Sequence, residues 1–403
     1  MDKITPISDV VWFQEGPGVR NTQYTTEGVK LLNVANLVDG EVDLSNTNRY
    51  ISEEEAYGKY KHFLVDEGDL IIASSGIKVD YFDKKMGFIK KEHLPLCMNT
   101  STIRFKPLNA DVLDIRYFMY FLKSESFKQQ LAVQITGSAQ LNFGPSHLKK
   151  MSVKMVPMAQ QKEIVHNLSE IDRLISYRQQ QLIKLDELVK SRFIEMFGDP
   201  RNNPNSFNVV SFNDCVEYMG DIGSNGANKV VVDHLDMKDE EDYALMVRFL
   251  NFTKNDFTDD VKYISKEAYD FFKKSQIFGG ELIICKIGSA GQNYIMPFLN
   301  RPVSLGLNQI MVRINDKTIM PYLYQYLNTD YGKQLIDGCI NGAVTKSITK
   351  TELKKIPVIV PPIDLQNEFA TFVEQTDKLK FEVKEALEKL ETLKKSLMQQ
   401  YFG

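Results

Sequence analysis

A long helical pattern that occurs twice constrains this chain more than any other feature of its sequence. The first copy, residues 160–198, has no proline and no glycine before Gly198, and its apolar side chains recur at the alternating spacings of a heptad seam. At 1.5 Å per residue, about 37 helical residues form a rod of roughly 55 Å. Such a rod is too long for the core of a compact domain, so the pattern predicts a spacer.

The second copy appears when the sequence is shifted by 205 positions, which places Gly198 on Gly403. Over the 62 positions 137–198 and their counterparts, 18 residues are identical without a gap. Unrelated helices share periodicity but not this much identity, so the chain contains an internal repeat. We expect two globular units, at residues 1–158 and 201–362, each followed by a spacer helix, at residues 159–200 and 363–403.

Both expected globular units show strand-like runs followed by a helical pattern. In the first unit the expected strands are 29–37, 68–76 and 100–105, and the expected helix is 115–134. In the second unit we match 247–252 to 29–34, 263–269 to 50–57, 280–289 to 68–76, 307–314 to 98–105 and 320–337 to the helix. The order predicts an α+β fold with two α/β globular domains in tandem, each followed by a long α-helix.

The two long helices are expected to pack on each other. Equal units joined by equal rods are most simply related by a twofold operation, which predicts an antiparallel coiled coil with pseudo-twofold symmetry. Four leucines lie off the main seam and should leave apolar surface for another protein. The residues that we expect at subunit or helix interfaces are Ile164, Ile171, Leu174, Leu185, Leu188, Phe369, Leu379, Leu390 and Leu393.

Sequence signatures of catalysis and of metal binding are missing. There is no GxxxxGK[ST] phosphate loop, no GxGxxG after a strand, no HExxH and no GxSxG, and the five histidines do not cluster. The four cysteines are scattered without metal-type spacing, which is typical of a reduced cytoplasmic chain. No apolar run approaches the ~20 residues that span a bilayer. We therefore expect a non-catalytic binding protein with no metal of its own.

Loops of small, polar and basic residues recur at corresponding places in the two units. Glycine lets a backbone approach a ligand closely, and Ser, Thr, Asn, Gln, Arg and Lys can contact phosphates or base edges. Such residues are also common in plain turns, and the net charge of −4 argues against nucleic-acid binding by bulk electrostatics. The candidate DNA-binding residues are Arg20, Thr22, Gln23, Tyr24, Ser74, Ser75, Lys78, Arg104, Ser138, Gln140, Asn142, Ser224, Asn225, Lys229, Lys286, Ser289, Asn308, Gln309, Thr345 and Lys346.

On these features the chain resembles the specificity subunit of type I restriction–modification systems. The resemblance covers essentially the whole chain. Its carriers are GPGVR at 16–20, the GSAQ loop with LKKMSVKMVP, the second copy GAVT with LKKIPVIVPP, and the duplicated rods ending in MFG and YFG. The second copy departs from the first at Thr345, where the first has Gln140, and it has no GPGVR beyond Asp221-Ile222-Gly223.

The resemblance implies a non-catalytic subunit with two target recognition domains, each reading one half of a split double-stranded DNA target. The helices would set the spacing and dock two methyltransferase subunits, and endonuclease subunits would join for cleavage. S-adenosylmethionine would be bound by the methyltransferase, and ATP and Mg²⁺ by the endonuclease, with no cofactor in this chain. Because partners can supply phosphate contacts, we expect the isolated chain to bind DNA weakly and in a salt-sensitive way.

Two other functions are compatible with a duplicated two-domain chain. A scaffold whose domains bind protein or peptide would show no DNA sequence preference and no methyltransferase partner. A self-sufficient methyltransferase or nuclease is disfavoured because its cofactor and metal motifs are missing, and a test for S-adenosylmethionine binding by the purified chain separates this alternative from the others.

Overall fold

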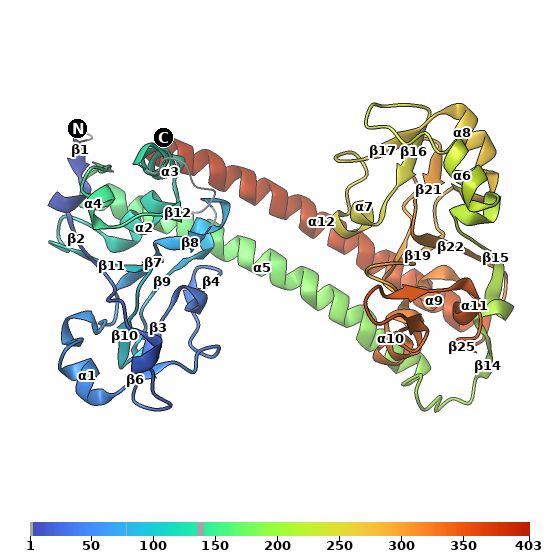
Figure 1. Ribbon diagram of the computed structural model, residues 1–403, viewed down its shortest axis with the longest axis horizontal. Coiled ribbons are helices and arrows are strands. Elements are labelled where there is room, and N and C mark those ends of the chain that lie inside the picture. The colour runs from blue at the N-terminus through green and yellow to red at the C-terminus, as the bar shows by residue number, and fades with distance from the viewer. Residues whose placement is uncertain (1–2, 78, 135–140) are drawn as a thin grey trace. The chain divides into compact units, whose positions relative to one another are not determined.

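The computed structural model describes residues 3–77, 79–134 and 141–403 (Figure 1). The chain forms two compact units, residues 1–179 with 385–403, and residues 180–384. The helices and strands of the first unit are β1 (Lys3–Pro6), β2 (Val11–Glu15), β3 (Val29–Leu32), β4 (Leu37–Val38), β5 (Glu41–Val42), β6 (Tyr50–Ile51), α1 (Glu53–Tyr57), β7 (Leu70–Ala73), β8 (Ser75–Ile77), β9 (Met86–Phe88), β10 (Leu96–Met98), β11 (Thr102–Pro107), α2 (Ile115–Lys123), α3 (Glu125–Gln134), β12 (Leu141–Asn142), α4 (Pro145–Leu148), β13 (Ser152–Met155) and the start of α5 (Met158–Phe197).

The second unit has a similar order of elements, but it has α6 before β16 and α7 in place of the β4–β5 pair. Its helices and strands are β14 (Asn208–Ser211), β15 (Val216–Gly220), α6 (Asn228–His234), β16 (Ala244–Val247), α7 (Phe249–Lys254), β17 (Lys262–Ile264), α8 (Lys266–Phe271), β18 (Gln276–Ile277), β19 (Leu282–Cys285), β20 (Asn293–Ile295), β21 (Val303–Leu305), β22 (Gln309–Ile314), α9 (Met320–Asn328), α10 (Asp330–Asp337), β23 (Ile340–Asn341), β24 (Ser347–Ile348), α11 (Lys350–Leu353), β25 (Pro357–Val360) and the start of α12 (Ile363–Phe402).

The sheets have matching topology in the two units. The central sheet is antiparallel, with strand order β2-β11-β7-β9 in the first unit and β15-β22-β19-β20 in the second. A smaller sheet is built around a parallel pair, β3 with β10 in one unit and β16 with β21 in the other. The strand before each long helix pairs antiparallel with the first strand of its unit, β13 with β1 and β25 with β14. The α+β fold with two tandem domains is thereby confirmed.

Several details of the predicted elements are wrong. The strand expected at 29–37 is β3, which ends at Leu32 before a 3-10 helix at Val34–Asn36, and the strand expected at 68–76 is divided into β7 and β8. Residues 247–252 are not a strand: the counterpart of β3 is β16, which ends at Val247, and α7 follows. An asparagine marks the true correspondence, because Asn36 Oδ1 accepts from the Asn33 N–H and Asn251 Oδ1 accepts from the Arg248 N–H, both at 2.9 Å.

The expected helix 115–134 is also two helices, α2 and α3. The backbone of Ser124 is extended, and the Ser124 hydroxyl donates to the Phe121 carbonyl (2.6 Å) while accepting from the Phe127 N–H (3.3 Å). Thr329 separates α9 from α10 in the same way, with its hydroxyl bonded to the Tyr326 carbonyl and the Gly332 N–H. A hydroxyl side chain that competes for helix backbone groups thus breaks both helices at the same place.

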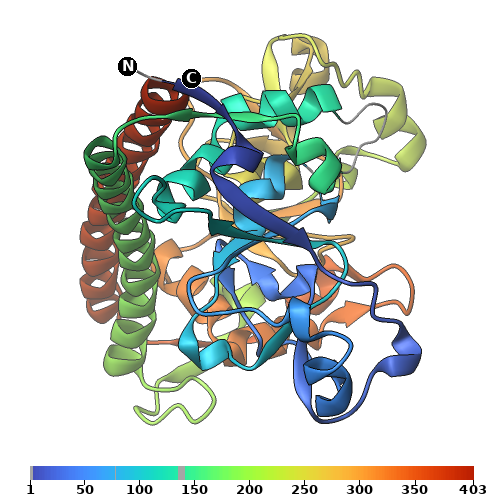
Figure 2. The ribbon, with the colours of Figure 1, turned by 90° about the vertical axis from the view of Figure 1, so that its left-hand side faces the viewer.

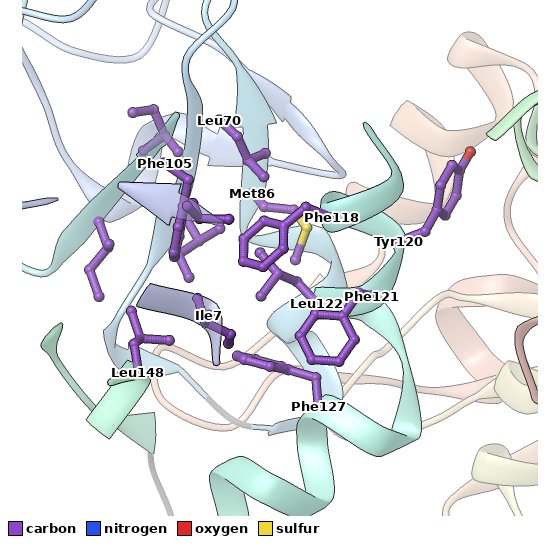
Figure 3. Close-up of a cluster of buried hydrophobic side chains, with 14 of the residues drawn as sticks. Ile7, Leu70, Met86, Phe105, Phe118, Tyr120, Phe121, Leu122, Phe127 and Leu148 are labelled. Carbon is purple, nitrogen blue, oxygen red and sulfur yellow. The ribbon is translucent and has the colours of Figure 1, made fainter. Parts of the chain in front are cut away.

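Apolar side chains fill the space between the central sheet and the helices of each unit. In the first unit, Phe118 packs 5.3 Å from Phe105 between ring centroids, and Phe121 packs 5.5 Å from Phe127 (Figure 3). The last turn of α12 closes this core, because Phe402 lies 5.0 Å from Tyr117. In the second unit, rings from α5, α9 and α12 meet, namely Phe193, Phe197, Tyr322 and Phe369.

Within each unit, the two long helices run antiparallel. In the first unit, Asn167 donates to the Tyr401 hydroxyl (3.1 Å) and Asp172 pairs with Lys394 (2.7 Å). Residue numbers therefore increase along α5 in the direction in which they decrease along α12. Figure 2 shows this start of α5 in green beside the end of α12 in red. In the second unit, Asp186 pairs with Lys380 and Arg192 with Glu368. The predicted antiparallel packing is therefore observed within both units.

A buried glutamine fixes the start of each long helix to its own domain. Gln161 Oε1 accepts from the Asp114 N–H (2.9 Å), and Gln161 Nε2 donates to the carbonyls of Val112 (2.9 Å) and Val156 (2.8 Å). Gln366, its counterpart in the repeat, bonds the backbone of Ile319, Lys317 and Pro361. Because both amides are fully buried and satisfied, the direction in which each helix leaves its domain is defined.

Candidate nucleic-acid interface

Three loops of the second unit meet at one end of its central sheet. Strands β15 and β19 both run antiparallel to β22, so they end at the same edge, where the loops 221–226 and 286–289 begin. The hairpin β23–β24 joins them there, because the Ile348 N–H donates to the Lys286 carbonyl (2.9 Å) and the Gly288 N–H to the Lys346 carbonyl (3.2 Å). Fold topology thus brings together the three loops that the sequence singled out in this unit.

Asp221 holds these three loops together. Its carboxylate accepts from Lys286 Nζ (2.7 Å) in the second loop and from Lys350 Nζ (2.8 Å) after the hairpin, and its Oδ1 also accepts from the Ser224 hydroxyl (3.0 Å). Although burial alone would raise the pKa of Asp221, the hydrogen bonds and charges of the two lysines lower it to about 2. The carboxylate is therefore ionised at neutral pH.

The cluster of Asp221, Lys286 and Lys350, which we call the lysine clamp, carries a net positive charge at the surface. Two ammonium groups face one carboxylate, which leaves one positive charge in excess. The Asp221 side chain is only 9% exposed, whereas those of Lys286 and Lys350 are 35% and 33% exposed. Solvent-facing ammonium groups held at a fixed spacing can contact a phosphate. Lys350 was not predicted from the sequence, and Asp221 was placed in a candidate loop without a role of its own.

Some of the other candidates of the second unit are exposed, and others hold the loops in place through hydrogen bonds. Asn225 fastens its loop, since its amide donates to the Ser275 hydroxyl (2.7 Å) and accepts from the Lys274 N–H (2.9 Å). Ser224 is half-buried and accepts from Lys350 Nζ (2.9 Å). The exposed candidates are Lys229, Ser289, Asn308, Thr345 and Lys346.

Gln309 corrects the prediction for this unit. Its side chain is fully buried, with the amide oriented to donate to the Val247 carbonyl (3.2 Å) and to accept from the Phe249 N–H (2.7 Å). It joins β22 to the end of β16 and is not available to a base edge.

In the first unit, the loops after β2 and β7 likewise lie at one end of the central sheet. The loop 16–24 follows β2, and residues 74–76 follow β7 and pair through β8 with β12. The Phe143 N–H donates to the Ser74 carbonyl (2.9 Å), which holds the segment after β12 beside residues 74–76. Gly16 is required where the first loop begins, because a Cβ there would lie 2.0 Å from the Asn99 carbonyl oxygen.

The candidates in the first loop are held in place by neighbouring side chains. Gln23 Nε2 donates to Glu55 (2.6 Å) and to the Tyr60 hydroxyl (3.0 Å), and the Tyr24 hydroxyl accepts from Asn99 Nδ2 (3.3 Å). Arg20, Thr22 and Asn142 are exposed, and Ser75 is half-buried. Lys78, Ser138 and Gln140 lie outside the described residues.

Arg104 and Ser74 correct the prediction for the first unit. Arg104 is 5% exposed and donates to the Leu64 and His62 carbonyls, to Gln14 and to Asp69, with its guanidinium 4.9 Å from the Trp12 ring. A guanidinium held by four acceptors in the interior supports the sheet and is not free to contact DNA. The Ser74 side chain is fully buried and likewise presents nothing to a ligand.

The helix residues predicted at interfaces fall into two groups. Ile164, Ile171 and Phe369 are buried, and Ile164 and Phe369 belong to the apolar cores of their own units, whereas Leu185 and Leu390 are half-buried. The off-seam leucines are exposed on the helix surface, with exposed fractions of 39% for Leu174, 48% for Leu188, 50% for Leu379 and 48% for Leu393.

Among the described residues, no group of three or more His, Cys, Asp or Glu side chains is placed to hold a metal ion. In the same ranges, no helix combines the length and the apolar character needed to cross a membrane.

The fold and the loops define a duplicated two-domain protein with one loop surface per domain. The model of the type I restriction modification DNA specificity domain matches this chain twice, over residues 20–187 and 220–394. The chain belongs to this family, whose members serve as specificity subunits of type I restriction–modification systems. Specificity subunits determine the DNA target, are not themselves catalytic and carry no cofactor.

Relatives of known sequence and structure agree with this assignment. The chain is 21% identical to the putative type I restriction enzyme MjaX specificity subunit of Methanocaldococcus jannaschii, over 92% of this chain and 85% of the relative. It is 22% identical to the MjaVIII specificity subunit of the same organism, over 47% of this chain and 43% of that relative. The match thus spans less than half of the MjaVIII protein.

Two solved structures share the fold along the whole chain. The type I S subunit from M. genitalium has a TM-score of 0.56 at 15% identity, covering 100% of this chain and 96% of that one. A chain from a study of complex assembly and conformational transition of the type I R-M system has a TM-score of 0.57 at 14% identity, with 100% and 97% covered.

Proposed function

We propose that residues 1–158 and 201–362 are target recognition domains that each read one half of a bipartite DNA target. The observation that carries this proposal is that the loops after corresponding strands, β2 and β7 in the first unit and β15 and β19 in the second, lie at the same end of the central sheet in both units. Two similar readers in one chain recognise two short sequences separated by a gap. The lysine clamp would position the second domain on a phosphate, and exposed polar residues of the loops would reach base edges.

The long helices set the gap and dock two methyltransferase subunits in this proposal. Their exposed apolar side chains support it, because large apolar side chains left on a helix surface are available for contacts with another protein. Leu174 and Leu379 are the natural positions to test, since they correspond in the repeat and belong to different units. Endonuclease subunits would join this complex for DNA cleavage, and the cofactors of both reactions would stay with the partners.

We expect the Leu174→Asp variant to lose one of the two methyltransferase subunits, and the variant with both Leu174→Asp and Leu379→Asp to lose both. A buried, unpaired carboxylate at the centre of an apolar contact costs several kcal/mol. Native mass spectrometry of the co-expressed subunits measures the stoichiometry, with Leu108→Asp as the control because Leu108 is 55% exposed and belongs to the loop after β11, not to a long helix. Full assembly of the double variant would contradict docking at these leucines.

The function itself is tested by a methylated-base map of a host genome with and without this gene, with the partner methyltransferase expressed. We expect a methyladenine motif in two parts with a fixed gap that disappears when the gene is deleted. Identical maps would favour the protein-binding scaffold instead.

A further inference from the structure

The hairpin β23–β24 places one apolar side chain at the edge of the loop surface in the second unit. Val344 is 97% exposed, more than any other large apolar side chain in the described part of the chain. It sits among polar and small residues, with Gly342, Ala343, Thr345 and Lys346 around it, all of them exposed. Leaving such a side chain in water has a cost that a contact with an apolar ligand group would remove.

The backbone holds this residue at the tip of a closed turn. Ile340 pairs with Ile348 and Asn341 with Ser347, so the residues between the strands must reverse the chain. Gly342 has a φ of +102°, and a Cβ there would lie 2.2 Å from the Thr345 carbonyl oxygen. Only glycine fits this position, and the turn therefore presents residues 343–345 outward.

The hairpin is also fixed to the lysine clamp. Ser347 forms a bridge with Ile287, and the Lys286 backbone accepts from the Ile348 N–H while its ammonium group binds Asp221. Two more exposed apolar side chains lie near the hairpin. Ile287 is 37% exposed and Leu307 is 44% exposed. Leu307 precedes Asn308, whose carbonyl accepts a hydrogen bond from the Lys286 N–H. A phosphate on the clamp would therefore set the position of the tip.

A DNA duplex offers such a tip one apolar partner. The major groove admits a two-stranded β-ribbon, and the C5 methyl group of thymine is the apolar feature of the base edges there. From the exposure of Val344, the closed turn and the attachment to the clamp, we propose that Val344 is a specificity-determining residue that contacts a thymine methyl group in the half-target read by the second domain. This inference rests on the proposed function and adds the chemical group that is read.

The test uses the complex of this chain with its methyltransferase subunits and DNA duplexes carrying its target. Each thymine of the half-target is replaced in turn by deoxyuridine, which pairs identically but lacks the methyl group. We expect one position at which the replacement weakens binding about fourfold, the worth of one buried methyl group. In the Val344→Ala complex, we expect the same replacement to change binding less than twofold, and thymine-containing DNA to bind about as weakly as the wild type binds the uracil duplex.

Val209→Ala serves as the matched control, because Val209 is 52% exposed on β14, outside the loop surface. It should keep the wild-type response to deoxyuridine. An unchanged response in Val344→Ala, or no sensitive thymine in the wild type, would overturn the inference while leaving the proposed function intact. A wild-type complex that binds target and scrambled DNA equally would overturn the proposed function, and this inference with it.

Discussion

Replacing both lysines of the clamp, Lys286→Gln with Lys350→Gln, is expected to weaken binding of the assembled complex to its DNA target by at least tenfold at physiological salt. Each lysine that contacts a phosphate releases a counterion, so removing two such contacts should lower the slope of log K against log salt by about 2. The loss should be similar for different DNA sequences, because phosphate contacts position the protein without reading bases.

Fluorescence anisotropy titrations at several salt concentrations measure both quantities. Lys266→Gln is a suitable control, since Lys266 is an exposed lysine of the same unit that also pairs with one aspartate. Equal thermal unfolding of the variants would show that the loops are still folded. If the double variant kept the wild-type salt slope, the clamp would not contact phosphates.

Asp221→Asn is expected to have the opposite effect on non-specific DNA binding. The change removes the carboxylate from between the two ammonium groups, so the clamp gains one positive charge and should bind random DNA severalfold more tightly. Target-directed methylation should fall, because the loops lose the group that fixes them to one another. If Asp221 only repelled DNA, its replacement would strengthen binding to random DNA without lowering methylation of the target. Stronger binding to random DNA together with weaker target methylation would show that Asp221 positions the loops.

The same variant makes a prediction about acid stability. The pKa of Asp221 in the folded chain is lowered to about 2 from the ordinary value of 3.8. A lowered pKa stabilises the folded state fully above about pH 4, and this contribution is lost as the pH falls towards 2. We expect the wild type to exceed Asp221→Asn by about 1–2 kcal/mol in free energy of unfolding at pH 7, with most of this difference lost by pH 2. A difference that stayed constant from pH 7 to pH 2 would contradict the ion-paired state of Asp221.

The repeat made the architecture predictable, because periodicity and residue identity are properties of the sequence alone. The long helices are observed at Met158–Phe197 and Ile363–Phe402, and the corresponding strands of the central sheets occur in both units. The shifted match at 247–252 arose where loop lengths differ between the copies, so that an apolar run was aligned by composition although the strand had already ended.

The individual site residues were harder to predict, because burial depends on partners that are distant in sequence. Arg104 was predicted to contact DNA, but its partner Asp69 and the Leu64 and His62 carbonyls enclose it. Lys350 lies 129 positions from Asp221, and only the fold reveals that they pair. Val344 was not predicted, because an apolar side chain in a loop gives no sign in the sequence that it is exposed.

The central claim, that each domain reads one half of the target, is tested most directly by exchanging one domain. Residues 1–158 are replaced by the equivalent segment of a family member with a different target, and the methylated-base map of the host is compared before and after. We expect one half of the bipartite motif to change while the other half and the gap stay the same. A motif that changed in both halves, or in neither, would contradict independent reading by the two domains.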